Sequence, residues 1–167
     1  MKVKLIIAVL LIASLAVGVA AASGNNRNFR THLSGDEEVP ARDTQAQGQV
    51  IFQVSKDGSS IDYKLIVANI DNVRAAHIHC GALGVNGPVG VTLFAGGGLG
   101  SVNGILAQGT ITDPDTVNSC GWTTLAEVIA AMESGDTYVN VHTNDGVNPA
   151  NTGPGDFPGG EIRGQID

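Results

Sequence analysis

Short segments in which apolar and polar residues alternate recur along this sequence, and a period of two residues limits the chain to β-rich folds. Two of them flank Asp57-Gly58, a dipeptide that favours a tight β-hairpin. Their apolar residues are Val50, Phe52 and Val54 before the turn and Ile61, Tyr63, Leu65 and Val67 after it. Further strands are expected at residues 29–33, 73–79, 90–94, 104–112, 137–143 and 161–166. Short strands separated by turn residues are typical of a sandwich or barrel.

One segment changes from the strand period to a helical one. Thr124 and Glu127 have the spacing of a capping box, which marks the start of a helix. The apolar residues that follow have helical spacing, and they are Leu125, Val128, Ile129 and Met132. Gly135 is expected to end the helix. The predicted fold is therefore mainly β, an antiparallel β-sandwich with one short helix across one end or face.

The first residues predict export. Lys2 and Lys4 precede an apolar run that ends in small residues at Ala20, Ala21 and Ala22, which is the pattern of a secretory signal peptide, residues 1–22. A short polar leader, residues 23–28, and a single domain, residues 29–167, follow. The mature chain has no second apolar segment long enough to span a membrane, so we expect a secreted, periplasmic or cell-surface protein.

The charge of the chain argues against two classes of partner. The formal net charge is −7 at pH 7, and no basic cluster occurs after the predicted signal peptide. Nucleic acids and anionic membrane surfaces are therefore not expected to bind.

The two cysteines, Cys80 and Cys120, are expected to form one disulfide bond. An even number of cysteines in an exported chain favours pairing over free thiols. The alternative is that Cys80 provides a thiolate metal ligand, because it directly follows two histidines.

Histidines on two predicted strands are the candidate metal ligands. His77 and His79 are two residues apart in one strand, so both imidazoles point to the same face. His142 lies on the polar face of another strand, and Arg163 faces outward from the last one. If these strands are neighbours, the three imidazoles converge on the outside of the sheet beside Arg163, under the long loop 144–160.

Three neutral imidazoles suit copper or zinc, and no carboxylates occur at the spacing that calcium sites use. The alternative is that the histidines are surface or hydrogen-bonding side chains with no metal. Asp145 and Asp156 could hydrogen-bond to a ligating histidine, although exposed loop aspartates are the commoner case.

Other polar and aromatic residues have simpler interpretations. His32 is expected at a solvated strand position, and the acidic run 36–38 as a solvated turn rather than a cation site. Residues 84–88 are expected to form a turn. Trp122 is expected to be a packing anchor.

The order of motifs resembles that of the chordin-type, or CHRD, domain over about residues 29–165. The segments that carry the resemblance are Leu33-Ser34-Gly35, Glu38-Val39-Pro40, Gly48, Ala76-His77-Ile78-His79-Cys80-Gly81, Asn86-Gly87-Pro88-Val89, Tyr138-Val139-Asn140-Val141-His142-Thr143 and Gly160-Glu161-Ile162-Arg163-Gly164-Gln165. The resemblance implies a secreted β-sandwich with a helix near its C-terminal part. It implies little about activity.

A weaker resemblance is to the copper site of copper/zinc superoxide dismutases. His77 and His79 resemble the His-x-His ligand pair, His142 resembles the later ligand, and Arg163 resembles the arginine that guides superoxide. The expected sandwich is superoxide dismutase-like or immunoglobulin-like. No histidine between Cys80 and Tyr138 could bridge two metals, and there is no zinc loop, so a two-metal enzyme is not expected.

The leading functional prediction is an exported domain that binds a transition metal, copper first and zinc as the alternative, through His77, His79 and His142. Arg163 would then serve as a catalytic residue if the bound metal has superoxide dismutase-like redox activity. The competing prediction is a metal-free extracellular module that binds an unknown protein partner. A hydrolase is not expected, because the sequence lacks a Gly-x-Ser-x-Gly nucleophile elbow.

Overall fold

A computed structural model describes residues 28–98 and 100–167. The predicted signal peptide and nearly all of the predicted leader lie outside the described residues. Within the described ranges the chain forms eight strands, one 3-10 helix and one α-helix. Their bounds are β1 (Asn28–Ser34), η1 (Gly35–Glu37), β2 (Gln47–Val54), β3 (Ile61–Asp71), β4 (Val73–Cys80), β5 (Val89–Ala95), β6 (Ser101–Ile111), α1 (Leu125–Glu133), β7 (Thr137–Thr143) and β8 (Ile162–Gln165).

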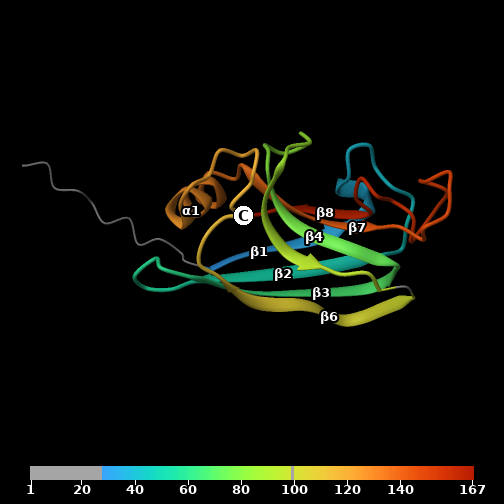
Figure 1. Ribbon diagram of the computed structural model, residues 1–167, viewed down its shortest axis with the longest axis horizontal. Coiled ribbons are helices and arrows are strands. Elements are labelled where there is room, and N and C mark those ends of the chain that lie inside the picture. Colours follow the sequence, from blue (N-terminus) through green and yellow to red (C-terminus); the bar gives the residue numbers. More distant parts are fainter. Residues whose placement is uncertain (1–27, 99) are drawn as a thin grey trace, which may run out of the picture.

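All eight strands belong to one antiparallel sheet in the order β5-β4-β7-β8-β1-β2-β3-β6. The sheet curls over itself, so that β8, β7 and β4 lie above β1, β2, β3 and β6 in Figure 1. The hydroxyl of Tyr63 on β3 donates a hydrogen bond of 2.6 Å to the Leu93 carbonyl on β5, which ties the two layers together. The predicted mainly β, sandwich-like fold is confirmed, with both layers made by one continuous sheet.

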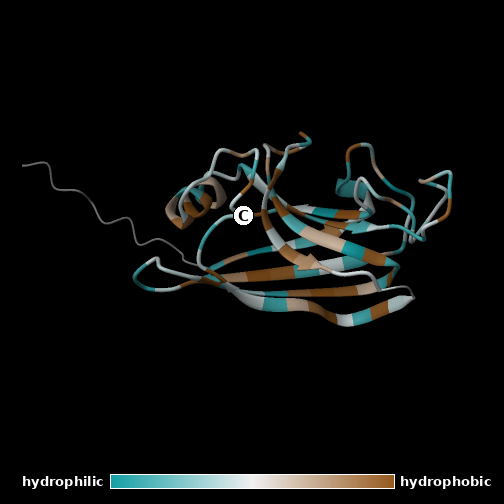
Figure 2. Cartoon of the chain, in the orientation of Figure 1, coloured by the Kyte–Doolittle hydropathy of each residue, from teal (hydrophilic) through white to brown (hydrophobic). Residues whose placement is uncertain are grey.

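The core lies between the two layers and consists of the apolar residues that the alternation predicts. On β2 the residues Val50, Phe52 and Val54 are buried, whereas those between them are exposed. Figure 2 shows the resulting alternation of apolar and polar residues along the strands. The β2–β3 hairpin turns at Asp57-Gly58 as predicted, with Gly58 at a φ of 73°. Such a left-handed conformation favours glycine.

The helix α1 begins and ends where the sequence predicts, and it lies at one end of the sandwich (Figure 1). The Thr124 side chain accepts a hydrogen bond from the Glu127 backbone, and the Glu127 carboxylate accepts one from the Thr124 backbone. Leu125, Val128 and Met132 are buried against the core. The end of the helix is marked by Gly135, whose φ is 72°.

The face of β4, β7 and β8 that points away from this core carries rows of polar side chains. Residues that pair across neighbouring strands share a face, and the rows are His77–Asn140–Arg163 and His79–Tyr138–Gln165, with His142 opposite Ala75. Two loops, residues 81–88 and 144–160, cover these rows by hydrogen bonds to their side chains. The outer face is therefore largely buried at this place.

Candidate metal centre

His77, His79 and His142 come together on the outer face, because β4 and β7 are hydrogen-bonded neighbours. One ring nitrogen from each histidine lies within 4.8 Å of one from each of the other two. The ring centroids are 5.0 Å apart for His77 and His142, and 5.6 Å apart for each of the other two pairs. The sequence-based expectation that the three imidazoles meet at one point thus agrees with the geometry.

Backbone carbonyls of the two covering loops orient two of the three rings. The Nδ1 atom of His79 lies 2.9 Å from the Gly87 carbonyl oxygen, and that of His142 lies 3.0 Å from the Pro158 carbonyl oxygen. A carbonyl oxygen can only accept, so both Nδ1 atoms carry the proton and both Nε2 atoms keep a free lone pair. This is the arrangement by which proteins orient ligating histidines.

One buried nitrogen on each ring has no hydrogen-bond partner among residues 28–98 and 100–167, and these atoms are His77 Nδ1, His79 Nε2 and His142 Nε2. Buried polar groups are nearly always hydrogen-bonded, and each exception calls for a cause. Three such exceptions occur in this one cluster of histidines, and a bound metal ion would account for all three.

The rings are neutral at physiological pH. Burial lowers the pKa of His79 and of His142 to about 4, and it also lowers the pKa of His77. The neighbouring imidazoles lower the pKa of His142 further, because a second positive charge in the cluster would be repelled. Metal ligands must be deprotonated, so low pKa values keep protons from competing for the three nitrogens.

The loop 81–88 approaches β4 and β7 very closely. A Cβ atom at Gly87 would collide with the Cys80 carbonyl oxygen, so this approach requires glycine. The Tyr138 hydroxyl accepts a hydrogen bond of 3.0 Å from the Gly87 amide and donates one of 3.2 Å to the Gly87 carbonyl. Residues 84–88 were expected to form a simple turn, and this segment also supplies the carbonyl that orients His79.

The predicted disulfide bond is confirmed, since Cys80 is joined to Cys120. The alternative interpretation of Cys80 as a thiolate ligand is therefore wrong, because a disulfide sulfur cannot supply one. The bond links the end of β4, directly after His79, to the segment before Trp122. Trp122 packs against Gly90 and the core, as expected of an anchor.

A family model described as the CHRD domain matches residues 29–166. The chain belongs to the CHRD family. This confirms the resemblance that the order of motifs predicts. No curated protein and no solved structure matches the chain. CHRD domains occur in extracellular proteins, and the Cys80–Cys120 disulfide fits an oxidising compartment. In the part of this CHRD-domain protein that the structure describes, no helix is long and apolar enough to cross a membrane.

Arg163 of the CHRD domain lies on the same outer face as the histidines but is only 1 % exposed. Its guanidinium carbon is 3.4 Å from the centre of the Tyr138 ring, and its nitrogens donate hydrogen bonds to the Val85 carbonyl and the Asn86 side chain. The neighbouring Glu161 is fully buried as well and accepts hydrogen bonds from Thr44, Thr143 and Gly155. Both side chains point away from the apolar core as the alternation predicts, but loops cover them.

The expectation that residues 36–38 form a solvated turn is wrong for Glu38. Asp36 and Glu37 are exposed, whereas Glu38 is only 6 % exposed and accepts a 3.4 Å hydrogen bond from Asn140. Burial raises the pKa of Glu38 to about 7, although the cations of Arg163 and Arg42 oppose this rise. The acidic run 36–38 does not reveal that Glu38 is buried beside β7, the strand that carries His142.

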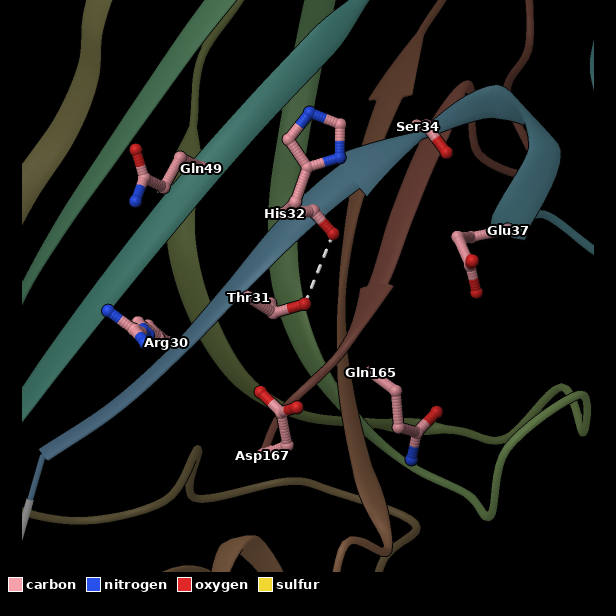
Figure 3. A pocket seen from close by; sticks show the side chains of 8 residues that line it. All are labelled: Arg30, Thr31, His32, Ser34, Glu37, Gln49, Gln165 and Asp167. Carbon is pink, nitrogen blue, oxygen red and sulfur yellow. Dashed lines mark hydrogen bonds between the residues drawn. The ribbon is translucent and has the colours of Figure 1, made fainter. Parts of the chain in front are cut away.

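Three further residues considered in the sequence make no described hydrogen bond to the histidine cluster, and they are Asp145, Asp156 and His32. Asp145 accepts a hydrogen bond from the Val147 amide and Asp156 from Thr152, so the partners of the histidines are carbonyls rather than these carboxylates. His32 is exposed on β1 as predicted, in an open polar hollow with Arg30 and Asp167 (Figure 3).

Proposed function

We propose that this CHRD-domain protein is exported and binds one transition-metal ion through His77, His79 and His142. Two observations on the described chain support the proposal: one ring nitrogen from each histidine lies within 4.8 Å of one from each of the others, and each ring has a buried nitrogen without a hydrogen-bond partner. Two nitrogens that each lie about 2.1 Å from an ion are at most about 4.2 Å apart. Three such nitrogens around one ion are about 3.4 to 3.6 Å apart, so the widest pair of the cluster would have to close in by up to about 1.4 Å when the ion binds.

Copper is the metal that we favour, with zinc as the alternative. The cluster found among the described residues contains three imidazoles and no carboxylate or thiolate. Imidazole nitrogens suit copper and zinc, whereas calcium and magnesium prefer oxygen ligands. Three protein ligands would also leave a position on the ion for a further ligand.

The test is a titration of the exported protein with Cu(II) and with Zn(II). We expect one ion per chain in the wild type, and a loss of affinity in His77→Ala, His79→Ala and His142→Ala that exceeds the roughly 10- to 100-fold typical of an outer-shell change. His32→Ala is the matched control, because it removes an exposed histidine outside the cluster. Equal binding by the control and the three variants would refute the proposal.

A narrower proposal is superoxide dismutase-like redox activity of the copper-loaded protein, with Arg163 as the residue that attracts the anion. The positive charge of Arg163 is among the causes that lower the pKa of His79, which supports an electropositive site. The burial of Arg163 argues that an anion would have to displace loop contacts to touch the guanidinium. A superoxide decay rate equal to that of metal-free protein would rule out this activity.

The competing proposal is a metal-free extracellular module that binds a protein partner. It is supported by apolar side chains that stand exposed on loops, at Leu83, Val117 and Val147. The metal content of protein collected after export separates the two proposals, because an interaction module needs no stoichiometric metal.

A further inference from the structure

The rings of Tyr138 and His79 and the guanidinium of Arg163 form one stack. The Tyr138 and His79 ring planes are 13° from parallel with their centres 4.8 Å apart, and the Arg163 guanidinium carbon lies 3.4 Å from the centre of the Tyr138 ring. The guanidinium and the imidazole are too large to share one face of the tyrosine at these distances. Tyr138 is therefore sandwiched between them, as expected for the central strand β7 between β4 and β8.

The same two side chains fasten the loop that orients His79. The Tyr138 hydroxyl makes two hydrogen bonds to the backbone of Gly87, and Arg163 donates to the Val85 carbonyl and the Asn86 side chain. Asn86 in turn donates a 2.7 Å hydrogen bond to the Val39 carbonyl. Tyr138 and Arg163 thus hold the consecutive loop residues 85–87 by hydrogen bonds. The carbonyl of the last of them, Gly87, accepts the hydrogen bond from His79 Nδ1.

We infer that Tyr138 and Arg163 are positioning residues of the metal centre, which clamp residues 85–87 so that the Gly87 carbonyl keeps His79 in the Nδ1–H tautomer with Nε2 facing the ion. The inference rests on the proposed function for the ion, but its effect on the imidazole exists without one. It assigns to Arg163 a role exerted through the loop and through the tyrosine ring.

His142 provides an internal comparison. Its Nδ1 proton is also held by a backbone carbonyl, but that carbonyl belongs to Pro158 in the other loop. Neither Tyr138 nor Arg163 has a described hydrogen bond to that loop. A substitution at Tyr138 should therefore allow His79 to adopt the other tautomer, whereas His142 should keep its proton on Nδ1.

The deciding variant is Tyr138→Phe, which keeps the ring stack and removes both hydroxyl bonds to Gly87. Tyr63→Phe is its control, because Tyr63 also loses a hydroxyl bond to a backbone carbonyl, away from the histidines. Arg163→Lys keeps the charge but loses the fork that reaches Val85 and Asn86, and Arg30→Lys on the exposed surface of β1 is its control.

The first measurement is the nitrogen-15 NMR spectrum of the histidine rings in metal-free protein. In Tyr138→Phe we expect His79 to lose its fixed Nδ1–H form, while His142 keeps it and Tyr63→Phe resembles the wild type. The second measurement is Cu(II) affinity, which we expect to fall about tenfold or more in Tyr138→Phe and in Arg163→Lys. Both controls should bind as the wild type does.

An unchanged His79 tautomer in Tyr138→Phe would overturn the inference. A shifted tautomer with unchanged Cu(II) affinity would overturn it too, because the orientation of His79 would then not matter to the ion. A wild type that binds neither Cu(II) nor Zn(II) would end the proposed function, and the metal-free spectra would still decide whether Tyr138 positions His79.

Discussion

At the scale of single residues, the pKa values of the histidines control how stability depends on pH. An unfolded histidine takes up its proton near pH 6.5, whereas His79 and His142 in the folded chain stay neutral down to about pH 4. The unfolded state binds more protons in this window, so the free energy of unfolding falls as the pH drops from 6.5 to 4. Each of the two histidines contributes about 3 kcal/mol to this loss.

Glu38 acts in the opposite direction. Its pKa is about 7 in the folded chain and near 4.5 otherwise, so the folded state binds more protons between these values. The stability that Glu38 contributes is present below pH 4.5 and is lost as the pH rises to 7. We expect Glu38→Gln to deepen the destabilisation of metal-free protein between pH 7 and pH 4.5 by about 3 kcal/mol.

Urea unfolding of the metal-free protein at these two pH values checks this prediction. Glu37→Gln is the control, since Glu37 is the exposed neighbour in the same acidic run. Equal pH dependence in the two variants would show that Glu38 does not hold its proton in the folded state.

At the scale of elements, the candidate site depends on one strand pair and on what holds its ends. The strand β4 carries two of the histidines, and the Cys80–Cys120 bond ties its last residue to a segment 40 positions further along the chain. The pairing of β4 with β7 brings in the third histidine. The disulfide therefore supports both the fold and the position of His79.

We expect the double variant Cys80→Ser, Cys120→Ser to lose about 4 kcal/mol of unfolding free energy, because a cross-link between residues 40 positions apart restricts the unfolded chain. Urea unfolding with the wild type in the absence of reductant gives the difference. The wild type unfolded in the presence of reductant should match the double variant. A midpoint unchanged by the substitutions would mean that the bond contributes little to stability.

At the scale of the whole molecule, binding of an ion should stabilise the fold, because the three histidines are adjacent only in the folded chain. A free ion at about 100 times its dissociation constant raises the free energy of unfolding by about 2.7 kcal/mol. We expect Cu(II) or Zn(II) to produce this increase in the wild type and a chelator to reverse it. The variant that lacks His77, His79 and His142 should unfold at the same urea concentration with and without the metal.

The strands and the helix could be predicted from the sequence because their signals are local. Alternation along β2 and β3 fixes which residues face the core, and the Thr124–Glu127 spacing fixes the start of α1. The common direction of His77 and His79 also follows from the period of a strand. These predictions need no knowledge of what lies next to each segment.

The burial of the outer face could not be predicted, because it depends on contacts between distant segments. Alternation places Arg163 and Glu161 away from the core, but only the return of loops 81–88 and 144–160 encloses them. Glu38 is buried for the same reason, since its partner Asn140 is 102 positions away. The position of β8 between β7 and β1 likewise leaves no trace in the pattern of a single strand.

The enclosure of the three ring nitrogens has a kinetic consequence. His77 Nδ1, His79 Nε2 and His142 Nε2 are all buried, so the ion that we propose could reach them only if one of the covering loops opened. The uptake rate should therefore level off at high ion concentration, at the frequency with which that loop opens. Release from the proposed site would be slow for the same reason, so the site would favour long-term retention of a bound ion over rapid exchange.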